Sequence, residues 1–309
     1  MVELLEALGL FSLAGLGVGF FGYLVVRGAE LLADKYGFDR FMVGFILLSV
    51  LTSTPEWTVA AASALQGAVE ISVGDILGSN IVNISLVTGI SMLFARKALT
   101  ITSSFSKSLV EILYLSTMIP IILLYFPVAS SLTGVLLMVF FALYVATAYK
   151  NSPPIAVQPH VVRTSAAKIF TMILLGGGML VLSAIQLVQA ARTIAEITGL
   201  TQLEVGAKLV AVITSSPELV TVAASMQRGE HAMALGNAVG SNLTNVTLIL
   251  GSLLALSGVN IVLGPHVYTV LFVVLVSMTF WFFSSRGQIT LSNTLILLAL
   301  YVSFLLFGR

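Results

Sequence analysis

The chain has 309 residues, of which 58% are hydrophobic and 9% are charged, and its formal net charge is +1. A soluble domain carries about 25% charged residues, so this composition excludes an ordinary soluble protein and predicts an all-α polytopic membrane protein. The chain has no Cys, which excludes a disulfide framework and a thiolate metal site. The small net charge does not point to any particular partner. We expect the protein to interact with the lipid bilayer and with small ions, and not with nucleic acid.

Apolar runs divide the chain into about ten segments of the length that a membrane-spanning helix needs, about 20 residues. We predict transmembrane helices near residues 8–34, 41–65, 69–95, 105–126, 129–149, 166–195, 202–227, 231–257, 265–284 and 289–307. The most polar connection, NSPPIAVQPHVVRTS at residues 151–165, contains three prolines and is predicted to be a loop. It separates residues 1–150 from residues 166–309, with about five predicted helices in each part.

Two stretches of the chain repeat each other. TSTPEWTVAAASALQG begins at Thr52 and TSSPELVTVAASMQRG begins at Thr214; each is followed by a second matching stretch, GDILGSNIVNISLVTGIS and GNAVGSNLTNVTLILGS. The stretches align without a gap at an offset of 218 − 56 = 162, which also relates Gly206 to Gly44. The first motif therefore covers residues 44–91 and the second covers residues 206–252. A fixed offset over this length indicates an internal duplication.

An odd number of helices in each half forces the two halves into opposite orientations. We therefore predict two inverted five-helix repeats, residues 1–150 and 166–309, an arrangement typical of secondary transporters with a substrate site near the membrane midplane. If the N-terminus is outside, all 14 Lys and Arg residues except Arg192, Lys208 and Arg309 lie at cytoplasmic ends. The prediction is an integral plasma (inner) membrane protein with both termini outside and a cytoplasmic linker at residues 151–165.

Two glutamates fall in the middle of predicted helices. Glu56 lies about fifteen residues into the helix at 41–65 and Glu218 about sixteen into the helix at 202–227, which places both near the bilayer centre. A carboxylate at this depth costs at least ~2.5 kcal/mol. A buried ion pair would need a Lys or Arg at the same depth, and Lys208, the nearest in sequence, is about 15 Å away along a helix. A bound cation is the simplest compensation.

A proline precedes each of these glutamates. Pro55 and Pro217 each remove one helical hydrogen bond and clash with the preceding turn, so they predict helix breaks that free backbone carbonyls as ligands. Irregular backbone at membrane depth is tolerated where it lines a cavity. The same turns carry four hydroxyl groups, which either bond back to their own helix or serve as ligands. These are Thr52, Ser53, Thr214 and Ser215.

Polar stripes follow in the next helix of each half. Asp75, Ser79 and Asn83 are spaced i, i+4 and i+8, and Asn237, Ser241 and Asn245 repeat that spacing, so each set shares one helix face. Such residues also pack helices together. Asn83 and Asn245 lie at the depth of the glutamates and are predicted ligands. Asp75 lies nearer the outside, where it either guards the outer entrance or is hydrated.

All of these candidate ligands are oxygen donors. Ca²⁺ takes 6–8 oxygen ligands, whereas Mg²⁺ demands tight octahedral geometry and retains its waters. The candidate set offers no imidazole or thiolate for Zn or Cu. Two glutamates neutralise one divalent cation, and they would equally accept two protons or several Na⁺ ions. The residues by themselves leave these alternatives open.

TSTPE and TSSPE, each followed by a G-[DN]-x-x-G-S-N-x-x-N stretch, resemble the two α-repeats of the cation/Ca²⁺ exchanger superfamily, and most closely its prokaryotic Na⁺/Ca²⁺ exchangers. The resemblance implies that Glu56 and Glu218 are the central Ca²⁺ ligands, completed by Thr52 and Thr214 and closed by two amides. It also implies that four serines line flanking Na⁺ sites. The amides are Asn83 and Asn245, and the serines are Ser53, Ser79, Ser215 and Ser241.

The chain departs from this family's pattern at three places. Leu51 and Ile213 stand where Gly is usual, which puts the packing or unwinding of those turns in doubt. Asp75 stands where Asn is usual and adds a charge. Several relatives have an Asp at one of the positions of Asn83 and Asn245, so this site has one carboxylate fewer and is expected to be independent of K⁺.

The expected function is therefore a secondary-active antiporter, not an enzyme, that exports Ca²⁺ in exchange for Na⁺ by alternating access. It is expected to need no cofactor and to work as a monomer, with Ca²⁺ and Na⁺ as transported ions. The alternative is a Ca²⁺/H⁺ antiporter in which Glu56 and Glu218 carry protons. The hydroxyls of Ser53 and Ser215 favour Na⁺, because proton-coupled members of the superfamily typically have Gly-Asn in place of Thr-Ser. A channel would need a selectivity filter, and no such sequence is present.

Overall fold

The computed structural model describes residues 2–36, 48–95, 99–100, 103–125, 130–151, 164–258, 264 and 267–308. Gly44, the start of the predicted helix at 41–65 and most of the 151–165 linker lie outside the described residues. Within the described residues the protein is all-α, as predicted, apart from two very short strands. These strands, β1 (Leu99–Thr100) and β2 (Gln288–Ile289), pair antiparallel with Leu99 opposite Ile289.

The helices of the first half overlap the predicted spans. They are α1 (Val2–Tyr36), α2 (Leu48–Thr52), α3 (Thr54–Leu65), α4 (Val69–Val82), η2 (Asn83–Val87), α5 (Thr88–Ala95), α6 (Ser103–Tyr125) and α7 (Ser131–Asn151). Here η denotes a single turn of π-helix. The segments α4, η2 and α5 follow one another without a gap and together cover the span predicted at 69–95.

The second half follows the same plan. Its helices are α8 (Ala166–Thr198), α9 (Gln202–Val205), η3 (Gly206–Val210), α10 (Ala211–Thr214), α11 (Ser216–Gln227), α12 (His231–Thr244), η4 (Asn245–Ile249), α13 (Leu250–Ser257), α14 (Val267–Ser285) and α15 (Leu291–Phe307). Several boundaries recur at the sequence offset. The start of α12 follows that of α4 by 231 − 69 = 162 residues, and the π-turns η4 and η2 differ by 245 − 83 = 162. The duplicated sequence therefore folds into duplicated local structure, including its irregular turns.

Several helices are long and apolar enough to cross a membrane. Among the described residues five qualify, and the pair Gln202–Thr214 and Ser216–Gln227, bent by 45°, makes a sixth if it is one span. The five are Val2–Leu32, Val69–Leu93, Ala166–Thr198, Met233–Ser257 and Val267–Ser285. Three shorter helices are also apolar: Ile112–Leu124, Ser131–Thr147 and Leu291–Phe307. The lipid-facing sides carry large apolar residues such as Leu13, Leu16 and Leu174, which are 63–73% exposed.

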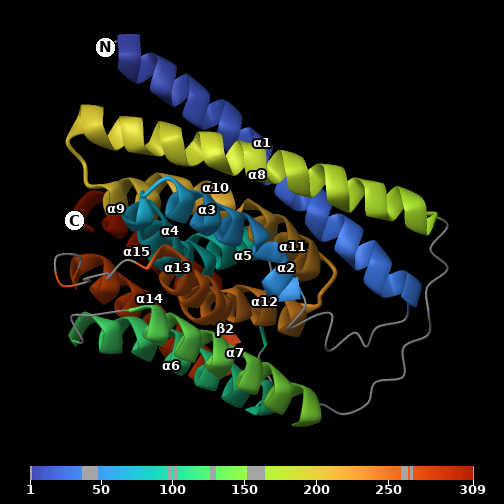
Figure 1. The fold of residues 1–309 in the computed structure, drawn as a ribbon. Coiled ribbons are helices and arrows are strands. Elements are labelled where there is room, and N and C mark those ends of the chain that lie inside the picture. Colours follow the sequence, from blue (N-terminus) through green and yellow to red (C-terminus); the bar gives the residue numbers. More distant parts are fainter. Residues whose placement is uncertain are drawn as a thin grey trace.

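The helices form layers around the duplicated motifs (Figure 1). The long helices α1 and α8 lie side by side across one face, and α6, α7 and α14 lie on the opposite side. The C-terminal end of α1 lies beside the start of α8, where Lys35 Nζ donates to the carbonyl of Thr164 at 3.0 Å. Between these layers lie α2 to α5 and α9 to α13, the helices that carry the duplicated motifs. The motifs are therefore the best shielded part of the chain.

Glycines let two of these inner elements touch backbone to backbone. A Cβ added at Gly78 would lie 2.3 Å from the carbonyl oxygen of Ala207, and one added at Gly74 would lie 2.1 Å from that of Leu203. On the other side, a Cβ at Gly206 would meet the carbonyl oxygen of Ile71 at 2.1 Å. Only residues without a side chain permit this approach, as small residues do at helix interfaces in membranes. The contact holds α4 against η3 and so fixes the position of Asp75 and Ser79.

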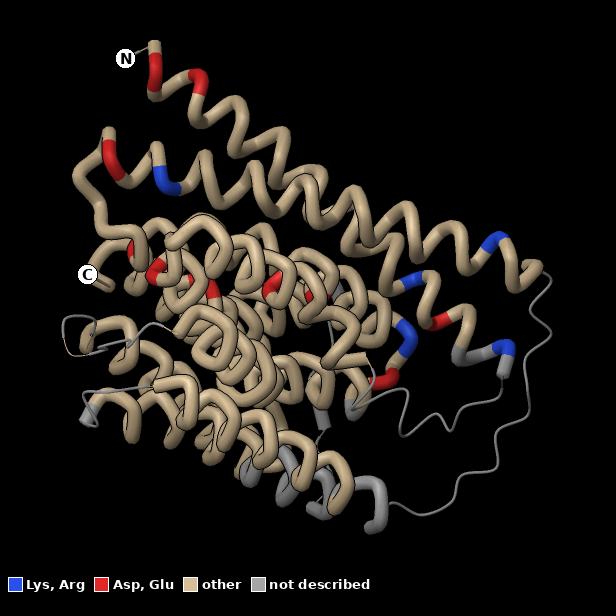
Figure 2. The backbone as a smooth tube through the Cα atoms, viewed as in Figure 1, with Lys and Arg blue, Asp and Glu red and all other residues tan. Residues whose placement is uncertain are grey.

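Charged residues are sparse along the bundle (Figure 2). Many lie near the ends of the long helices, and a few acidic positions lie inside the bundle among uncharged helices. The ion pairs seen among the described residues join sequence neighbours at the surface: Arg27–Glu30, Arg192–Glu196 and Arg228–Glu230. Exposed pairs of this kind contribute little to stability. The buried carboxylates therefore require a different explanation.

Candidate cation-binding site

Each central glutamate accepts a hydrogen bond from the opposite half of the chain. Ser53 Oγ donates to Glu218 Oε1 at 3.2 Å, and Ser215 Oγ donates to Glu56 Oε1 at 3.4 Å. Ser53 and Ser215 are the residues at which the two helices break, and both glutamates are fully buried. The two halves thus meet at the positions that the sequence predicted as central.

A second crossed set surrounds the first. Thr214 Oγ1 donates to Asp75 Oδ1 at 2.8 Å and lies 3.4 Å from Ser79 Oγ. In the other half, Thr52 Oγ1 lies 3.3 Å from both Asn237 Oδ1 and Ser241 Oγ. Ser241 Oγ is also 3.3 Å from Glu218 Oε1. The structure therefore brings the predicted threonines and serines together around the glutamates. They form two clusters that are related by the duplication, one around Thr214 and one around Thr52.

Asn80 and Asn242 are the residues that sequence reasoning missed. Asn83 Nδ2 donates to Asn242 Oδ1 at 3.2 Å, and Asn245 Nδ2 donates to Asn80 Oδ1 at 3.1 Å. Asn80 Nδ2 and Asn242 Nδ2 donate in turn to each other's backbone carbonyl, at 3.3 and 2.9 Å. These crossed amides fix the orientation of Asn83 and Asn245. A signal for them was present, because both stand in the repeated GSN triplet and differ by 242 − 80 = 162.

Five buried oxygens in this region have no hydrogen-bond partner in the described part of the chain. They are Glu56 Oε2, Asp75 Oδ2, Asn83 Oδ1, Glu218 Oε2 and Asn245 Oδ1. A buried polar atom left without a partner costs about 1–3 kcal/mol, and more if it is charged. All five atoms act as acceptors when the carboxyl groups are ionised. All five atoms could therefore bind a cation, and hard cations such as Ca²⁺ and Na⁺ prefer oxygen ligands of this kind.

The helix breaks are built as the prolines predicted. Ser53 has non-helical dihedrals (φ −80°, ψ 13°), and so has Ser215 (φ −77°, ψ 9°), and a proline stands in the first turn of the helix that follows each. Pro55 offers no N–H to the carbonyl of Leu51, and Thr54 Oγ1 donates to that carbonyl at 2.6 Å instead. The carbonyl of Leu51 is therefore already hydrogen-bonded, whereas the proline had predicted a carbonyl that is free to bind an ion. In the second half, the corresponding Ser216 Oγ has no partner among the described residues.

The two amides predicted as ligands also lie at helix irregularities. The π-turns η2 and η4 begin at Asn83 and Asn245 respectively. In the first, Thr88 Oγ1 donates to the carbonyl of Asn83, five residues earlier, at 2.8 Å. Single π-turns inside α-helices are frequent at functional sites. Both predicted amide ligands therefore stand at turns of a kind that is common at functional sites.

Asp75 is not hydrated, contrary to one of the two alternatives expected for it. Its side chain is completely buried and accepts hydrogen bonds from Thr214 and Ser79. The close contact of α4 with η3 covers this end of the helix and removes it from water. Thr214, which donates to Asp75, is followed in the chain by Ser215, which donates to Glu56. Asp75 therefore belongs to the same buried cluster.

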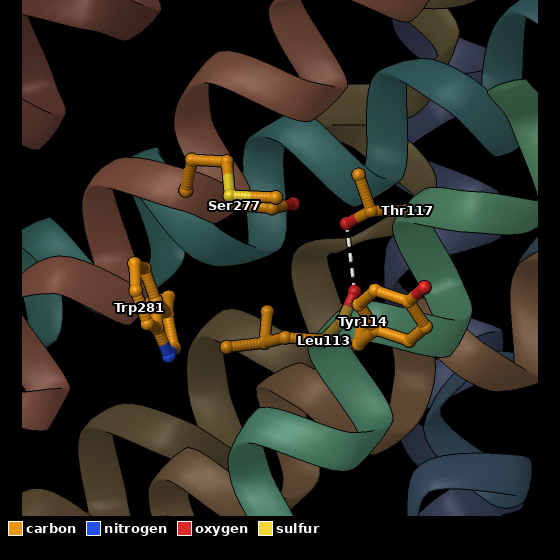
Figure 3. Close-up of a pocket in the computed structure, with 6 residues that line it drawn as sticks. Leu113, Tyr114, Thr117, Ser277 and Trp281 are labelled. Atoms are coloured by element: carbon orange, nitrogen blue, oxygen red, sulfur yellow. Dashed lines mark hydrogen bonds between the residues drawn. The ribbon is translucent and has the colours of Figure 1, made fainter.

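The cavities open to the surface differ in character from this cluster. One, of about 210 Å³, lies between α6 and α14 and is lined by mostly apolar side chains that include Leu113, Tyr114 and Trp281 (Figure 3). The described residues that line it include no carboxylate. A larger cleft of about 680 Å³ runs between α1 and α10–α11 and is bordered by Ser216 and Pro217. That cleft reaches the helix that carries Glu218.

The described residues contain no group of three or more His, Cys, Asp and Glu side chains placed to hold one metal ion. A purely carboxylate or imidazole site is therefore not built in this part of the chain. The cluster instead combines carboxylates with amides and hydroxyls. Such mixed oxygen sites suit hard cations that are bound and released. Fold and site together define a membrane cation transporter.

Comparisons with known proteins agree with this class. The model of the family described as sodium/calcium exchanger protein matches residues 6–150 and 168–308. The CaxA protein of Alkalimonas amylolytica, named as an antiporter, is 32% identical over 237 residues, 73% of each chain. A structure of the sodium-calcium exchanger NCX_Mj covers 100% of both chains at 26% identity, with a TM-score of 0.69. The structure of an H⁺/Ca²⁺ exchanger, CAX, covers 98% of this chain and 82% of its own at 17% identity, with a TM-score of 0.80.

The chain belongs to the sodium/calcium exchanger protein family, within the cation/Ca²⁺ exchanger superfamily. It is an integral membrane protein and a cation antiporter, not an enzyme. The resemblance seen in the duplicated motifs is thereby confirmed.

Proposed function

We propose that the protein exports Ca²⁺ in exchange for Na⁺ by alternating access, with Glu56 and Glu218 as the central Ca²⁺ ligands. The observation that carries the proposal is the set of unpartnered, fully buried carboxylate oxygens contributed by the two halves of the chain. Two carboxylates neutralise one divalent cation. The unpartnered amide oxygens of Asn83 and Asn245 add two further ligands, so that protein atoms supply a large part of the 6–8 oxygens that Ca²⁺ takes.

The flanking hydroxyls are the proposed Na⁺ ligands. Ser53 and Ser215 each donate to the glutamate of the other half, and a hydroxyl that rotates away from the carboxylate offers its lone pairs to a cation. Because each hydroxyl contacts the same carboxylates as Ca²⁺, Na⁺ and Ca²⁺ compete for one centre. The complete proposed set of Na⁺ ligands is Ser53, Ser79, Ser215 and Ser241, whereas Thr52 and Thr214 complete the Ca²⁺ site.

We place this site at the midplane of ten transmembrane helices, arranged as two inverted five-helix repeats at residues 1–150 and 166–309. Helix boundaries that recur at an offset of 162 support the two repeats. The contact of Lys35 with Thr164 joins the end of α1 to the start of α8, at the side where the linker at residues 151–165 would lie in the cytoplasm. Both termini then face outward across the plasma membrane, and one chain contains the whole site, so a monomer suffices.

Alternating access requires that bound ions favour one conformation over the other. The long helix α1, which packs along α8, contacts the proline breaks of both halves: Gly22 lies against Pro55 and Pro217. Sliding of this helix pair would uncover one side of the site and cover the other. The cleft bordered by Ser216 and Pro217 supports access from the side of α1. An empty site with bare carboxylates resists closure, which suppresses leak.

The second candidate function is Ca²⁺/H⁺ exchange by the same glutamates. It is favoured by the likeness of the fold to CAX, whose TM-score of 0.80 exceeds the 0.69 for NCX_Mj. The hydroxyls of Ser53 and Ser215 favour Na⁺, because a proton carrier needs no such ligands. The identity of 26% with NCX_Mj over the full chain, against 17% with CAX, supports the same choice.

The coupling ion is tested by ⁴⁵Ca²⁺ uptake into proteoliposomes. One set is loaded with Na⁺ at equal pH on both sides, and the other is loaded with choline and carries a pH gradient. We expect uptake in the Na⁺-loaded vesicles and background uptake in the others. Uptake driven only by the pH gradient would replace Na⁺ by H⁺ in the proposal and leave the Ca²⁺ site unchanged.

A further inference from the structure

The end of α3 is tied to the long helix α8, beside which it lies (Figure 1). Gln66, the residue that caps α3, donates from Nε2 to the carbonyl of Ile185 at 3.0 Å, and Arg192 Nη1 donates to the carbonyl of Gln66 at 3.5 Å. Val59 and Ala62 of α3 belong to one buried apolar cluster with residues of α8. In the first half, the short helix after the proline break is therefore closed against a long helix.

The duplication gives each of these contact residues an equivalent in the second half, at the offset of 162. There the short helix after the proline break is α11, and the long helix is α1. The equivalents of Gln66, Ile185 and Arg192 are respectively Arg228, which caps α11, and Tyr23 and Glu30 of α1, since 228 − 66, 185 − 23 and 192 − 30 are all 162.

The second half is open at these equivalent positions. Tyr23 lines the cleft of about 680 Å³ that lies between α1 and α10–α11. In the described part of the chain, Arg228 donates to Glu230 at 3.3 Å, and Glu30 accepts from Arg27 at 2.8 Å. Both ion pairs join sequence neighbours, and neither crosses the cleft.

We infer that Arg228 and Glu30 form an ion pair across this cleft in the opposite access state, in which α1 closes on α11 as α8 closes on α3 here. The inference rests on the proposed function, because it assigns residues to the two states of alternating access. In transporters built from inverted repeats, the halves move against each other around the site. A contact that closes one half is therefore expected at the equivalent position of the other half in the opposite state.

The reach and the charges of these residues fit such a pair. The bond from Arg192 to Gln66 shows that the two positions come within hydrogen-bond distance when the helices close. At the equivalent positions the chain carries an acid on α1 and an arginine at the end of α11, so closure brings opposite charges together.

The pair forms by an exchange of partners. Arg228 leaves Glu230 and Glu30 leaves Arg27, so no charge is left alone in either state. The four side chains are 27–57% exposed, and ion pairs at such exposure differ little in energy. The exchange therefore biases the two states only weakly, as suits a transporter that must visit both.

The test measures the ratio of the two states with cysteine reporters in a chain that has no Cys of its own. Val220→Cys lies in the cleft that is open here, and Thr58→Cys lies at the equivalent position (220 − 58 = 162), which is partly buried here. Each reporter is placed alone in the purified full chain with Na⁺ and Ca²⁺ present, and its rate of labelling by a water-soluble maleimide is measured. The ratio of the two rates follows the ratio of the two states.

A double-mutant cycle isolates the ion pair across the cleft. The ratio is measured for the parent chain, Glu30→Gln, Arg228→Gln and the double variant, each with either reporter. Loss of the local partners occurs in the single and double variants alike and cancels in the cycle. We expect a coupling of about two- to fivefold in favour of the state in which the cleft at Val220 is closed, the effect of one exposed ion pair. Purely additive effects would overturn the inference.

Two controls sharpen the result. Glu196→Gln combined with Arg228→Gln tests an acidic residue of α8 that is 65% exposed and paired with Arg192, and it should show no coupling. Gln66→Ala removes the bond to Ile185 and should shift the ratio about two- to tenfold toward labelling at Thr58. An unchanged ratio would contradict the closing role of Gln66.

Failure of the proposed function is distinguishable from failure of this inference. ⁴⁵Ca²⁺ binding by Glu56→Gln reports on the central site and does not involve the ion pair. Normal Ca²⁺ binding by Glu56→Gln, with coupling between Glu30 and Arg228, contradicts the proposed Ca²⁺ site alone. Ca²⁺ binding lost in Glu56→Gln, with additive effects of Glu30→Gln and Arg228→Gln, contradicts the ion pair alone.

Discussion

The crossed amides of Asn80 and Asn242 make a specific prediction for Asn80→Ala. This change removes the acceptor of Asn245 Nδ2, at 3.1 Å, and the donor to the carbonyl of Asn242, at 3.3 Å. The carbonyl keeps a helical N–H partner, but the buried amide of Asn245 loses its partner. One unsatisfied buried group costs about 1–3 kcal/mol and one lost hydrogen bond about 0.5–1.5 kcal/mol. We expect a total loss of about 2–4 kcal/mol in the free energy of unfolding.

The same change should weaken Ca²⁺ binding without touching a ligand. Released from Asn80, the amide of Asn245 rotates and its Oδ1 loses the orientation that presents it to the cation. Loss of a group that orients a metal ligand typically costs about 10–100-fold in affinity. The assay is a ⁴⁵Ca²⁺ binding isotherm on detergent-purified protein, paired with thermal unfolding in the absence of Ca²⁺.

A matched control and a double variant separate positioning from packing. Ser72→Ala, on the same helix, removes a buried hydroxyl that has no partner among the described residues, and it should leave both measurements near wild type. Asn80→Ala combined with Asn242→Ala should cost about the sum of the two, because each amide donates to a backbone carbonyl that alanine retains. The expected loss of Ca²⁺ affinity is at least about tenfold. The orienting role is refuted if Asn80→Ala is destabilised but keeps a Ca²⁺ affinity within about twofold of wild type.

Three further predictions follow from the packing and the helix breaks. Gly78→Ala should lower the free energy of unfolding by about 3 kcal/mol or more, because its Cβ would lie 2.3 Å from a backbone oxygen that cannot move aside. The control is Gly177→Ala, whose added Cβ would have no neighbouring atom within 4 Å among the described residues. It should be neutral or slightly stabilising in thermal unfolding. Thr221→Val should cost about 1–2 kcal/mol, because Asn237 Nδ2 loses its acceptor, whereas the exposed Thr279→Val should change the unfolding midpoint little; equal effects would contradict this. Pro217→Ala restores an N–H to the turn at which the helix pair is bent by 45°. Stability should be unchanged or higher, since the proline cost the helix a hydrogen bond, but ⁴⁵Ca²⁺ uptake should fall about tenfold. Undiminished uptake would show that the helix break is not needed for transport.

The sequence allowed prediction of those site residues that are chemically unusual in an apolar helix or that recur in the duplicated motif. Glu56 and Glu218 stood out because a charge is rare in an apolar helix, and the offset of 162 paired each candidate with its equivalent. The structure adds that the contacts of these glutamates are crossed, since Ser53 donates to Glu218 and Ser215 donates to Glu56. The ionic roles of these residues remain predictions for the assays above.

The parts that escaped prediction depend on distant backbone contacts. The burial of Asp75 could not be predicted from its position along one helix, because it depends on the approach of Gly74 to Leu203, 129 residues later (203 − 74). Asn80 lies off the stripe of Asp75, Ser79 and Asn83, so periodicity within one helix gave no reason to select it. The π-turns at Asn83 and Asn245 shift the side-chain register locally, and α-helical periodicity does not anticipate them.

The central claim is that Glu56 and Glu218 together bind the transported Ca²⁺. The most direct measurement is ⁴⁵Ca²⁺ uptake into Na⁺-loaded proteoliposomes by wild type, Glu56→Gln and Glu218→Gln, because Gln keeps the size and hydrogen-bonding shape of Glu without its charge. We predict uptake at the level of protein-free vesicles for both variants, with the unfolding temperature in the absence of ions unchanged or raised, since each removes a buried charge. Near-normal uptake by either variant would contradict the account.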